Sequence, residues 1–579
     1  MIRTHTCGEL RLDHVGHAVT LCGWVQRIRN KGSLLWLDLR DRHGITQLIF
    51  EAETGATLIQ QAKELGREYV IKVQGTVIAR KVRNPHMPTG TIELQVQTLE
   101  VLNTAKTPPF LVEDETDGGE ELRMQYRYLD LRRPSLQSNL LLRHQVMQHI
   151  RTYLNAQQFL EIETPLLIKS TPEGARDFIV PSRMHPDQYY ALPQSPQIYK
   201  QLLMIAGFDR YYQLARCCRD EDLRADRQPE FTQVDCELSF VTQEDVLPIF
   251  EGLVKHLFQH INNIQLPPFP RMPYAQAMQL YGTDKPDLRL GMPFVELTHL
   301  VQQRGCAMFD QAALVVGICA QGCAQYTRRQ IDQLTQFVKQ PQVGASGLIY
   351  VKYTSAGHFQ SSVDKFFNQT QLATWAEALQ AQPGDLMLVL AGAVQATRQA
   401  LAALRLRMGD ELGLRNEQVF APLWVVDFPL LVWDAMKKRY QTQHHPFTAP
   451  QIADLPLLDK QPEAVHAQAY DLVINGVEIG GGSMRICNRA LQERLLRMLG
   501  FSLEESNQQF GFLLEALEYG APPHGGIALG LDRLCALLGG VTSIRSFMAF
   551  PKNSASRDIM LQAPAPLTQE QLQELGIKL

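Results

Sequence analysis

The sequence lacks the long apolar run that a membrane-spanning helix needs. No stretch approaches the roughly 20 consecutive apolar residues that cross a bilayer. The first residues, MIRTHTCGELRLDH, contain no apolar core of the kind found in secretion signals. We therefore expect a cytoplasmic protein that does not associate with membranes. A hydrophobic content of 45% and a charged content of 20% are typical of a soluble globular chain.

Cysteine motifs that bind zinc are also missing. The ten cysteines include no CxxC pair and no cluster with histidine at the spacing of zinc ligands. We interpret them as reduced and mostly packed thiols. The net charge of −4 neither requires nor excludes nucleic acid, so an RNA partner would have to bind local basic patches. A chain of 579 residues is expected to contain about three domains.

Residues 20–102 contain short alternating segments that are typical of β-strands. Five such segments, broken by Gly, Asn and charged turns, with a helical stretch near residues 56–66, predict a small closed barrel of OB type. Trp36 offers a stacking surface for an unpaired base. Basic residues lie at the predicted strand ends and loops: Arg27, Arg29, Lys31, Arg80, Lys81 and Arg83. The alternative is that Trp36 belongs to the core and that the basic residues are simply solvated.

Residues 211–240 have the alternating pattern of an antiparallel hairpin with one charged face. A period of two places Arg219 and Glu221 on one face of the first strand, and Asp235 and Glu237 on one face of the second. Like charges side by side repel unless a ligand or metal lies between them. The hairpin, whose connecting loop carries two further arginines, therefore suggests a site for an anionic substrate. A solvated charged hairpin is the alternative.

Residues 471–483, DLVINGVEIGGGS, predict a second hairpin that turns at Asn475 and Gly476. In the expected register Asp471 faces Gly480, so that Asp471 and Glu478 become diagonal neighbours on one face. Two carboxylates in this arrangement can chelate a hard cation such as Mg²⁺. The glycines at 480–482 leave room for a ligand to approach the backbone. A polar hairpin edge is the alternative.

Two predicted helices carry a basic residue near their N-terminus, where it could bind an anionic substrate. Ser195 and a following proline begin a helix on which Lys200 could pair with a substrate carboxylate. Residues 524–538, HGGIALGLDRLCALL, predict a strand that runs into a helix, and Arg533 then lies at the positive end of the helix dipole, where phosphates bind. For both cations a solvated position on a helix surface is the alternative. Residues 432–443, VWDAMKKRYQTQ, are expected to form a basic hairpin.

These segments resemble the three motifs of the class II aminoacyl-tRNA synthetases. FLEIETP is similar to the first motif, RDED and its hairpin to the second, and GLDRL to the third. TPEGARDF, ALPQSPQIYKQLLM, HHPFTAP and INGVEIGGGSMRI resemble the bacterial-type aspartyl-tRNA synthetases of subclass IIb, and the resemblance covers essentially the whole chain. It implies an α+β multidomain fold with an N-terminal OB-fold barrel, an antiparallel-sheet catalytic domain and an inserted α/β domain. It also implies a homodimer formed partly through the first motif.

The resemblance implies domain boundaries as well. The expected domains are an OB-fold anticodon-binding domain at 1–105, a hinge or linker at 106–135, a catalytic domain in two parts at 136–287 and 421–555, an inserted domain at 288–420, and a short C-terminal extension at 556–579.

The resemblance further implies a role for each residue of the motifs. Arg219 and Arg533 would be the catalytic cations, and Asp471 and Glu478 would hold Mg²⁺. Aspartate would be bound by Glu173, Ser195, Gln197, Lys200, Arg219, Asp235, His444 and Arg485. ATP would be bound by Arg219, Asp220, Glu221, Gln228, Glu478, Gly530, Leu531, Asp532 and Arg533. The tRNA anticodon would be bound by Arg27, Arg29, Lys31, Trp36, Gln47, Arg83 and Glu93.

The implied activity is that of an aspartate–tRNA ligase, which converts L-aspartate and ATP to aspartyl-adenylate and transfers the aspartyl group to tRNA(Asp). The residues leave open whether the enzyme also charges tRNA(Asn), and we favour an enzyme that charges tRNA(Asp) alone. One alternative is a sister synthetase for asparagine, although Lys200 and Arg485 would then face a neutral amide. Another is a non-catalytic RNA-binding paralogue, which would be expected to have lost Arg219, Glu478 or Arg533.

Overall fold

The protein is described here by a computed structural model that covers residues 2–31, 34–51, 55–171, 174–223 and 226–577. The chain divides into two compact units. The first comprises Met1–His144, Leu223–Gln228 and Ser543–Gln571, and the second comprises Gln145–Asp222, Pro229–Thr542 and Leu572–Leu579. Over the described ranges, no helix is both long enough and apolar enough to pass through a membrane.

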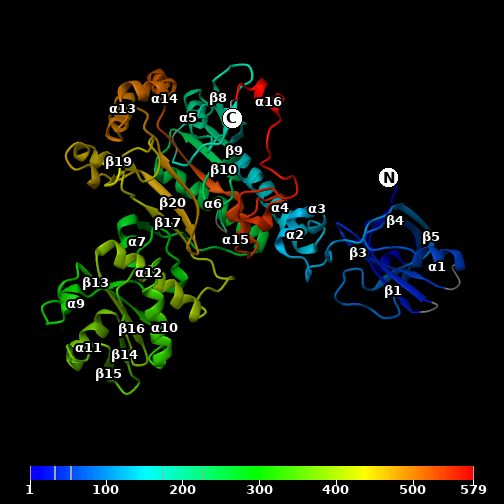
Figure 1. The fold of residues 1–579 in the computed structure, drawn as a ribbon, viewed down its shortest axis with the longest axis horizontal. Coiled ribbons are helices and arrows are strands. Elements are labelled where there is room, and N and C mark those ends of the chain that lie inside the picture. Colours follow the sequence, from blue (N-terminus) through cyan, green and yellow to red (C-terminus); the bar gives the residue numbers. More distant parts are fainter. Residues whose placement is uncertain (1, 32–33, 52–54, 172–173, 224–225, 578–579) are drawn as a thin grey trace. The chain divides into compact units, whose positions relative to one another are not determined.

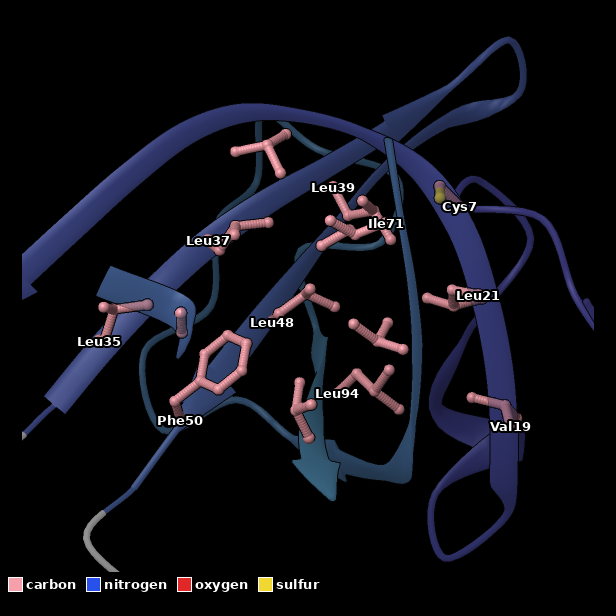
Figure 2. Close-up of a cluster of buried hydrophobic side chains, with 14 of the residues drawn as sticks. Cys7, Val19, Leu21, Leu35, Leu37, Leu39, Leu48, Phe50, Ile71 and Leu94 are labelled. Carbon is pink, nitrogen blue, oxygen red and sulfur yellow. The ribbon is translucent and has the colours of Figure 1, made fainter. Parts of the chain in front are cut away.

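The described part of the first unit contains a closed five-stranded barrel, which confirms the predicted OB-type fold. The strands are β1 (Ala18–Lys31), β2 (Leu34–Asp41), β3 (Gly44–Phe50), β4 (Val70–Ala79) and β5 (Ile92–Asn103), in the order β1-β2-β3-β5-β4, and α1 (Ala56–Lys63) lies between β3 and β4. Alternate side chains of each strand point inward, such as Leu35, Leu37 and Leu39 of β2, and together they fill the barrel (Figure 2). The period-two pattern of the sequence is therefore what closes the barrel around an apolar core.

Buried ion pairs tie the segment after the barrel to the barrel itself. Arg40 donates two hydrogen bonds to the Glu68 carboxylate, at 2.9 and 2.8 Å, and Arg132 lies 2.8 Å from the same carboxylate. The segment contains α2 (Glu120–Gln125), α3 (Arg127–Asp130) and the start of α4 (Pro134–Ala156). Asp130 at the end of α3 pairs with Arg127 at 2.6 Å and with Arg133 at 2.9 Å. This part of the predicted hinge is therefore held by specific polar contacts.

Within its described residues, the second unit holds an eight-stranded sheet with the order β11-β17-β20-β21-β22-β10-β9-β6 (Figure 1). The strands are β6 (Leu160–Glu161), β9 (Arg210–Cys218), β10 (Glu230–Ser239), β11 (Arg271–Pro273), β17 (Pro422–Val426), β20 (Ala469–Ile474), β21 (Val477–Met484) and β22 (His524–Gly530). Neighbouring strands are antiparallel except at the two edges, where β11 pairs with β17 and β6 pairs with β9 in parallel. The predicted antiparallel floor is confirmed.

Strand β10 lies inside this sheet, and both of its faces are buried. Val234, Cys236 and Leu238 are fully buried on the apolar face, as the alternating pattern predicts. Asp235 and Glu237 on the opposite face are equally inaccessible, at 0% exposure. The solvated-hairpin alternative for this stretch is therefore wrong, because charged side chains without solvent must find partners inside the protein.

The β20–β21 hairpin has the predicted turn but a different register. Asn475 and Gly476 both have positive φ, 55° and 79°, as a tight hairpin turn requires. The pairing of Val473 with Glu478 is as predicted, but a β-bulge then shifts the register so that Asp471 faces Gly481. The predicted partner, Gly480, is wrong by one residue. The extra residue bends the strand while keeping Asp471 near Glu478.

A separate five-stranded antiparallel sheet occupies the described part of residues 288–420, and helices pack on both of its faces. Its strands, in the order β12-β13-β16-β14-β15, are β12 (Val295–Glu296), β13 (Leu314–Ala320), β14 (Ile349–Tyr353), β15 (Phe359–Ser361) and β16 (Leu386–Gly392). One apolar cluster joins the sheet to α10 (Arg328–Val338) and α12 (Val394–Glu411). A second joins it to α8 (Thr298–Val301), α9 (Ala307–Asp310) and α11 (Gln369–Ala378).

The remaining elements include the predicted basic hairpin. This hairpin is confirmed as β18 (Leu431–Asp434) paired with β19 (Arg439–Thr442), and a second small hairpin pairs β7 (Ile179–Pro181) with β8 (Tyr189–Ala191). The other helices are α5 (Gln197–Ile205), α6 (Gln243–Asn262), α7 (Tyr274–Tyr281), α13 (Arg489–Met498), α14 (Leu503–Ala516), α15 (Leu531–Leu538) and α16 (Gln569–Glu574).

Candidate active site

A polar cavity of about 340 Å³ lies over the eight-stranded sheet. Its described lining comes from the start of α5, the end of β9, β10, the β20–β21 hairpin and the loop before Phe447. The lining residues are Gly174, Ala175, Gln194, Ser195, Gln197, Lys200, Arg219, Glu221, Gln233, Asp235, His444, His445, Asp471, Glu478, Gly481, Gly482, Ser483, Arg485 and Ala528. Residues from distant parts of the sequence therefore share one concave site.

At one end of the cavity, two cations and two carboxylates form a buried cluster. The Lys200 ammonium lies 2.7 Å from Asp235 Oδ1 and 3.2 Å from Glu237 Oε2. Arg485 donates to both oxygens of Glu237, at 2.9 and 3.3 Å, and to Ser483 Oγ at 2.7 Å. The four charged side chains are at most 5% exposed. We call Lys200, Asp235, Glu237 and Arg485 the charged quartet.

The two acids of the quartet have different environments. Burial raises the pKa of Asp235, and the Lys200 ammonium offsets part of that rise. Burial also acts to raise the pKa of Glu237, but Arg485 and Lys200 together lower it. Glu237 is satisfied by both cations, whereas Asp235 Oδ2 is buried without a hydrogen-bond partner. Asp235 can therefore accept a hydrogen bond from a ligand in the cavity.

Two adjacent histidines line the same end of the cavity. Burial and the nearby Arg485 lower the pKa of His444 to about 4, and they lower the pKa of His445 well below its ordinary value. Both rings are therefore neutral at neutral pH. The backbone N–H of Phe447 donates to Nδ1 of His445 at 3.3 Å, so the ring proton of His445 lies on Nε2. That Nε2 is buried and has no partner, so it presents a donor to a ligand.

Asp471 and Glu478, which also line the cavity, form a carboxylate pair, and Nδ1 of His444 lies 3.9 Å from Asp471 Oδ1. Burial, and then the negative charge of Glu478, raise the pKa of Asp471 well above its ordinary value. Asp471 Oδ1 is buried without a hydrogen-bond partner. Two facing carboxylates with an unsatisfied oxygen are the donor set of a hard divalent cation such as Mg²⁺, so these residues fit that ion.

The glycines of β21 serve sheet packing as well as ligand access. A Cβ on Gly480 would lie 2.4 Å from the carbonyl oxygen of Ala528, and one on Gly482 would lie 2.0 Å from that of Gly526. A Cβ on Gly481 would lie 2.2 Å from Asp471 Oδ1. The expectation that the glycines leave room for a ligand fits Gly481 and Gly482, which line the cavity, and is wrong for Gly480, whose space the neighbouring strand β22 fills. Gly481 also allows Asp471 to reach its position.

The two predicted catalytic arginines are held in different ways. Arg219 follows the last residue of β9, and its guanidinium lies 5.1 Å from the centre of the Phe231 ring and donates to the Gln194 carbonyl at 3.4 Å. It lines the cavity. Arg533 lies in the first turn of α15 and donates to the backbone carbonyl of Glu478 at 3.0 Å. Arg533 therefore contacts the backbone of the β20–β21 hairpin at Glu478, and it is not among the residues that line the cavity.

The other residues predicted to bind ATP differ in whether they line the cavity or support it. Leu531 is fully buried, and Asp532 accepts a hydrogen bond from the backbone N–H of Thr232 at 2.9 Å. They fix the start of α15, which follows Gly530, and so position Arg533. Glu221 lines the cavity, and Asp220 is exposed and pairs with Arg176 at 3.7 Å.

The remaining residues predicted to bind aspartate or ATP differ in their positions. Gln228, in the first unit, exchanges hydrogen bonds with the backbone of Lys552, at 3.2 and 2.7 Å. Gln197 and Ser195 line the cavity at the start of α5, and Gln197 Nε2 is buried without a partner. Glu173 lies outside the described residues.

The predicted anticodon residues share an outer face of the barrel. Trp36 is half-buried and faces Arg29 across the β1–β2 pair, while its neighbours Leu35 and Leu37 point into the core. The alternative that Trp36 is a core residue is therefore wrong. Gln47 accepts hydrogen bonds from Arg29 and Arg80, at 3.0 and 2.9 Å, and donates to Glu93 at 2.6 Å.

The other three predicted anticodon residues are exposed cations at the ends of this face. Arg27 lies 3.4 Å from Glu113 of the linker segment, Lys31 is the last residue of β1, and Arg83 follows β4. The face as a whole combines an aromatic surface with hydrogen-bonding groups of both kinds.

Three residues of these sites were missing from the predicted set. Glu237 holds both cations of the quartet, and its place on the polar face of β10 was the available signal. His445 adjoins the predicted His444, but no sequence pattern distinguishes the two rings. Arg80 was recognised only as a basic loop residue, yet it bonds to Gln47 and its Nη1 is buried without a partner.

Comparisons with known proteins agree with this geometry. Residues 119–554 match the family described as tRNA synthetases class II (D, K and N), and residues 19–102 match the OB-fold nucleic acid binding domain. The chain is 62% identical to the aspartate–tRNA ligase of Amoebophilus asiaticus, covering 100% of this chain and 99% of that one. It is 56% identical to the aspartate–tRNA ligase of Porphyromonas gingivalis with the same coverage.

Solved structures share the fold at low sequence identity. Asparaginyl-tRNA synthetase from Pyrococcus horikoshii complexed with asparaginyl-adenylate has a TM-score of 0.61 and 20% identity, over 95% of this chain and 98% of that one. A putative aspartyl-tRNA synthetase from Leishmania major Friedlin has a TM-score of 0.58 and 18% identity, over 94% and 91%.

Proposed function

Because the chain belongs to the aspartate–tRNA ligase family of the class II aminoacyl-tRNA synthetases, we propose that it joins L-aspartate to tRNA(Asp) in two steps. First, an α-carboxylate oxygen of aspartate attacks the α-phosphorus of ATP, a new O–P bond forms, and the bond to the β-phosphate breaks. Pyrophosphate leaves and aspartyl-adenylate remains. A hydroxyl of the terminal ribose of tRNA then attacks the acyl carbon, loses its proton, and displaces AMP.

The charged quartet is the observation that carries this proposal. An ammonium has three N–H donors and a guanidinium has five. Lys200 and Arg485 use two and three of theirs within the protein, so each keeps donors for the side-chain carboxylate of aspartate. The unpartnered Asp235 Oδ2 suits the substrate ammonium, with Ser195, Gln197 and His444 around it. Glu173 belongs to the same proposed set by resemblance.

The proton on His445 Nε2 adds a donor at the same end of the cavity. A neutral imidazole whose proton is fixed on one nitrogen can donate but cannot accept there. We assign it to a carboxylate oxygen of aspartate, which only accepts hydrogen bonds. His445 thus joins the predicted aspartate-binding residues.

A second set of residues, of which Arg219, Asp471 and Glu478 line the cavity, suits the triphosphate of ATP. Arg219, braced by Phe231 and the Gln194 carbonyl, would hold the α-phosphate, where negative charge spreads in the transition state. Arg533 would hold the γ-phosphate. Mg²⁺ held by Asp471 and Glu478 would supply positive charge next to the phosphates. Asp220, Glu221 and Gly530 would complete the ATP site, with Leu531 and Asp532 as its support, and Gln228 belongs to the proposed set by resemblance alone.

Catalysis would come from positioning, because no protein nucleophile is required. The quartet would orient the amino acid, and Arg219, which lines the same cavity, would hold the phosphorus next to the attacking oxygen. The quartet is buried and its charges are fixed before substrate arrives, so little reorganisation is needed during the reaction.

Exchange of labelled pyrophosphate into ATP tests the proposed role of Arg219. Arg219→Ala should abolish aspartate-dependent exchange while tRNA binding, measured by filter retention, stays nearly intact. Arg216→Ala is the matched control, because Arg216 lies on β9, just before Arg219, is 53% exposed and pairs with Glu230 at 2.7 Å. An Arg219→Ala variant with normal exchange would remove this residue from the site.

The same assay tests a second candidate amino acid. The quartet carries two positive and two negative charges, so its net charge alone does not exclude asparagine. Exchange that depends on L-asparagine and not on L-aspartate would favour an asparagine enzyme over the proposed one. A protein without exchange for either amino acid would favour the RNA-binding paralogue.

We propose that the outer face of the barrel binds the tRNA anticodon, with Trp36 stacking on a base and Gln47 and Glu93 contacting base edges. Arg27, Arg29, Lys31 and Arg83 would contact the backbone or the last anticodon base. We favour charging of tRNA(Asp) alone over charging of tRNA(Asn) as well, and labelled aspartate with transcripts of both tRNAs tests this. A cytoplasmic homodimer is proposed on the family resemblance.

A further inference from the structure

Helices α4 and α6 pack closely at a point away from the cavity lining. The hydroxyl of Tyr153 on α4 donates to the carbonyl of Ile249 on α6 at 2.9 Å. A Cβ on Gly252 of α6 would lie 2.2 Å from that hydroxyl, so only glycine permits the contact. The two helices are therefore fixed against each other at this level, and side chains one turn further along face each other in defined positions.

Three histidines meet at this contact. His149 comes from α4, and His256 and His260 come from successive turns of α6. One ring nitrogen from each lies within 4.8 Å of the other two. The ring centre of His149 lies 5.3 Å from that of His256 and 5.2 Å from that of His260. Among the described residues, this is the one set of three metal-ligating side chains brought together in this way.

The hydrogen bonds around the rings leave nitrogen lone pairs for a ligand. Nδ1 of His260 lies 2.8 Å from the carbonyl oxygen of His256 and must donate to it, so Nε2 of His260 carries a lone pair. Nε2 of His256 is buried and has no hydrogen-bond partner. A buried imidazole nitrogen without a partner is costly unless something binds it.

We propose that His149, His256 and His260 form a binding site for a divalent transition metal of the zinc class. Three neutral imidazoles suit Zn²⁺ in preference to Mg²⁺ or Ca²⁺, which prefer oxygen ligands. A Zn–N bond is about 2.0–2.1 Å long, which places the nitrogens of a tetrahedral site about 3.3 Å apart, so from separations of up to 4.8 Å they must approach one another by up to about 1.5 Å through side-chain rotation. The fourth position is left to water or another ligand. A bound ion would link α4 to α6.

Metal titration of the full-length protein tests this site. The protein is first dialysed against a chelator and then titrated with Zn²⁺ by calorimetry, and with Co²⁺ by visible absorption, whose intensity reports tetrahedral coordination. His260→Gln removes an exposed ligand without disturbing packing. His144→Gln is the matched control, because His144 is an exposed histidine on α4, the helix that carries His149, and lies outside the cluster.

The wild-type protein should bind one Zn²⁺ more than the His260→Gln variant, or bind it at least 10-fold more tightly. Zn²⁺ should raise the thermal midpoint of the wild type and of His144→Gln, and should not raise that of His260→Gln. Unchanged thermal midpoints of the metal-free variants would show that they are folded. Equal Zn²⁺ stoichiometry and affinity in the wild type and His260→Gln would overturn the proposed site. So would a loss of Zn²⁺ binding in His144→Gln as large as the loss in His260→Gln. Neither result bears on the proposed synthetase activity.

Discussion

Replacement of Lys200 by methionine separates binding of the amino acid from binding of ATP. Lys200 is 2% exposed, and its ammonium is held between Asp235 and Glu237. Methionine keeps most of the side-chain volume and removes the charge. Arg485 still neutralises Glu237, but Asp235 loses its partner, and since the Lys200 ammonium lowers the pKa of Asp235, that pKa rises further in the variant. Asp235 then tends to bind a proton and no longer offers a negative charge to the substrate ammonium.

The size of the effect follows from two separate losses. A hydrogen bond between charged groups contributes about 1.5–3 kcal/mol, so kcat/KM for aspartate should fall about 10- to 150-fold. Removing one partner of a buried ion pair costs about 3–5 kcal/mol, which should appear as a lower thermal midpoint. The KM for ATP should stay within about threefold of the wild-type value, because the ion pairs of Lys200 are with Asp235 and Glu237 and not with the residues proposed to hold the triphosphate.

Pyrophosphate exchange with each substrate varied in turn measures both constants. Lys255→Met is the control, because Lys255 is a surface lysine that pairs with Glu251 one helical turn away. The double variant Lys200→Met/Asp235→Asn should regain part of the lost stability, since no unpaired carboxylate remains, without regaining aspartate affinity. Equal losses for ATP and aspartate would refute the reasoning, and so would recovery of aspartate affinity in the double variant.

Three further perturbations follow from the same structure. Asp471→Asn should raise the thermal midpoint in EDTA, because it removes the cost of burying a carboxylate and the repulsion from Glu478, and should lower the apparent Mg²⁺ affinity in exchange at least 10-fold; a destabilised variant in EDTA would contradict this. Trp36→Ala should raise the KM for tRNA about 5- to 150-fold with unchanged exchange, whereas Tyr519→Ala, an exposed aromatic control, should leave both unchanged. His444 has a folded pKa of about 4 against about 6.5 unfolded, so the unfolded state takes up the proton first and stability falls as pH drops from 6.5 to 4, by about 3 kcal/mol in all. His444→Gln should remove that part of the pH dependence of thermal unfolding, and an unchanged pH profile would contradict it.

The features that sequence could predict are those set by local chemistry. Alternating apolar residues close the barrel, and the adjacent Asn475 and Gly476 supply the positive φ of the hairpin turn. Ser195 lies just before α5, which begins at Gln197, as the helix-start pattern indicates. In each case neighbouring residues suffice, because backbone preferences and period-two burial act over a few positions.

The features that sequence missed depend on contacts between distant segments. Nothing near Val477 signals the bulge that moves Asp471 opposite Gly481, because the bulge is set by how β21 fits between β20 and β22. Arg485 and Glu237 are 248 positions apart, so no local pattern could pair them. The same limit applies to His149 and His256, which only the packing of α4 on α6 brings together.

The observed pairing also changes the physical reason for choosing aspartate. The sequence suggested that Lys200 and Arg485 would select a carboxylate by positive charge, but the two acids of the quartet cancel that charge. The groups that can still bind the substrate side chain are all hydrogen-bond donors. They are the spare N–H groups of both cations and the Nε2–H of His445. A carboxylate accepts on both oxygens, whereas asparagine would turn its NH₂ toward one of these donors and leave two buried polar groups unsatisfied. At about 1–3 kcal/mol for each such group, hydrogen-bond polarity alone gives a discrimination of at least 5- to 150-fold without any net charge in the pocket.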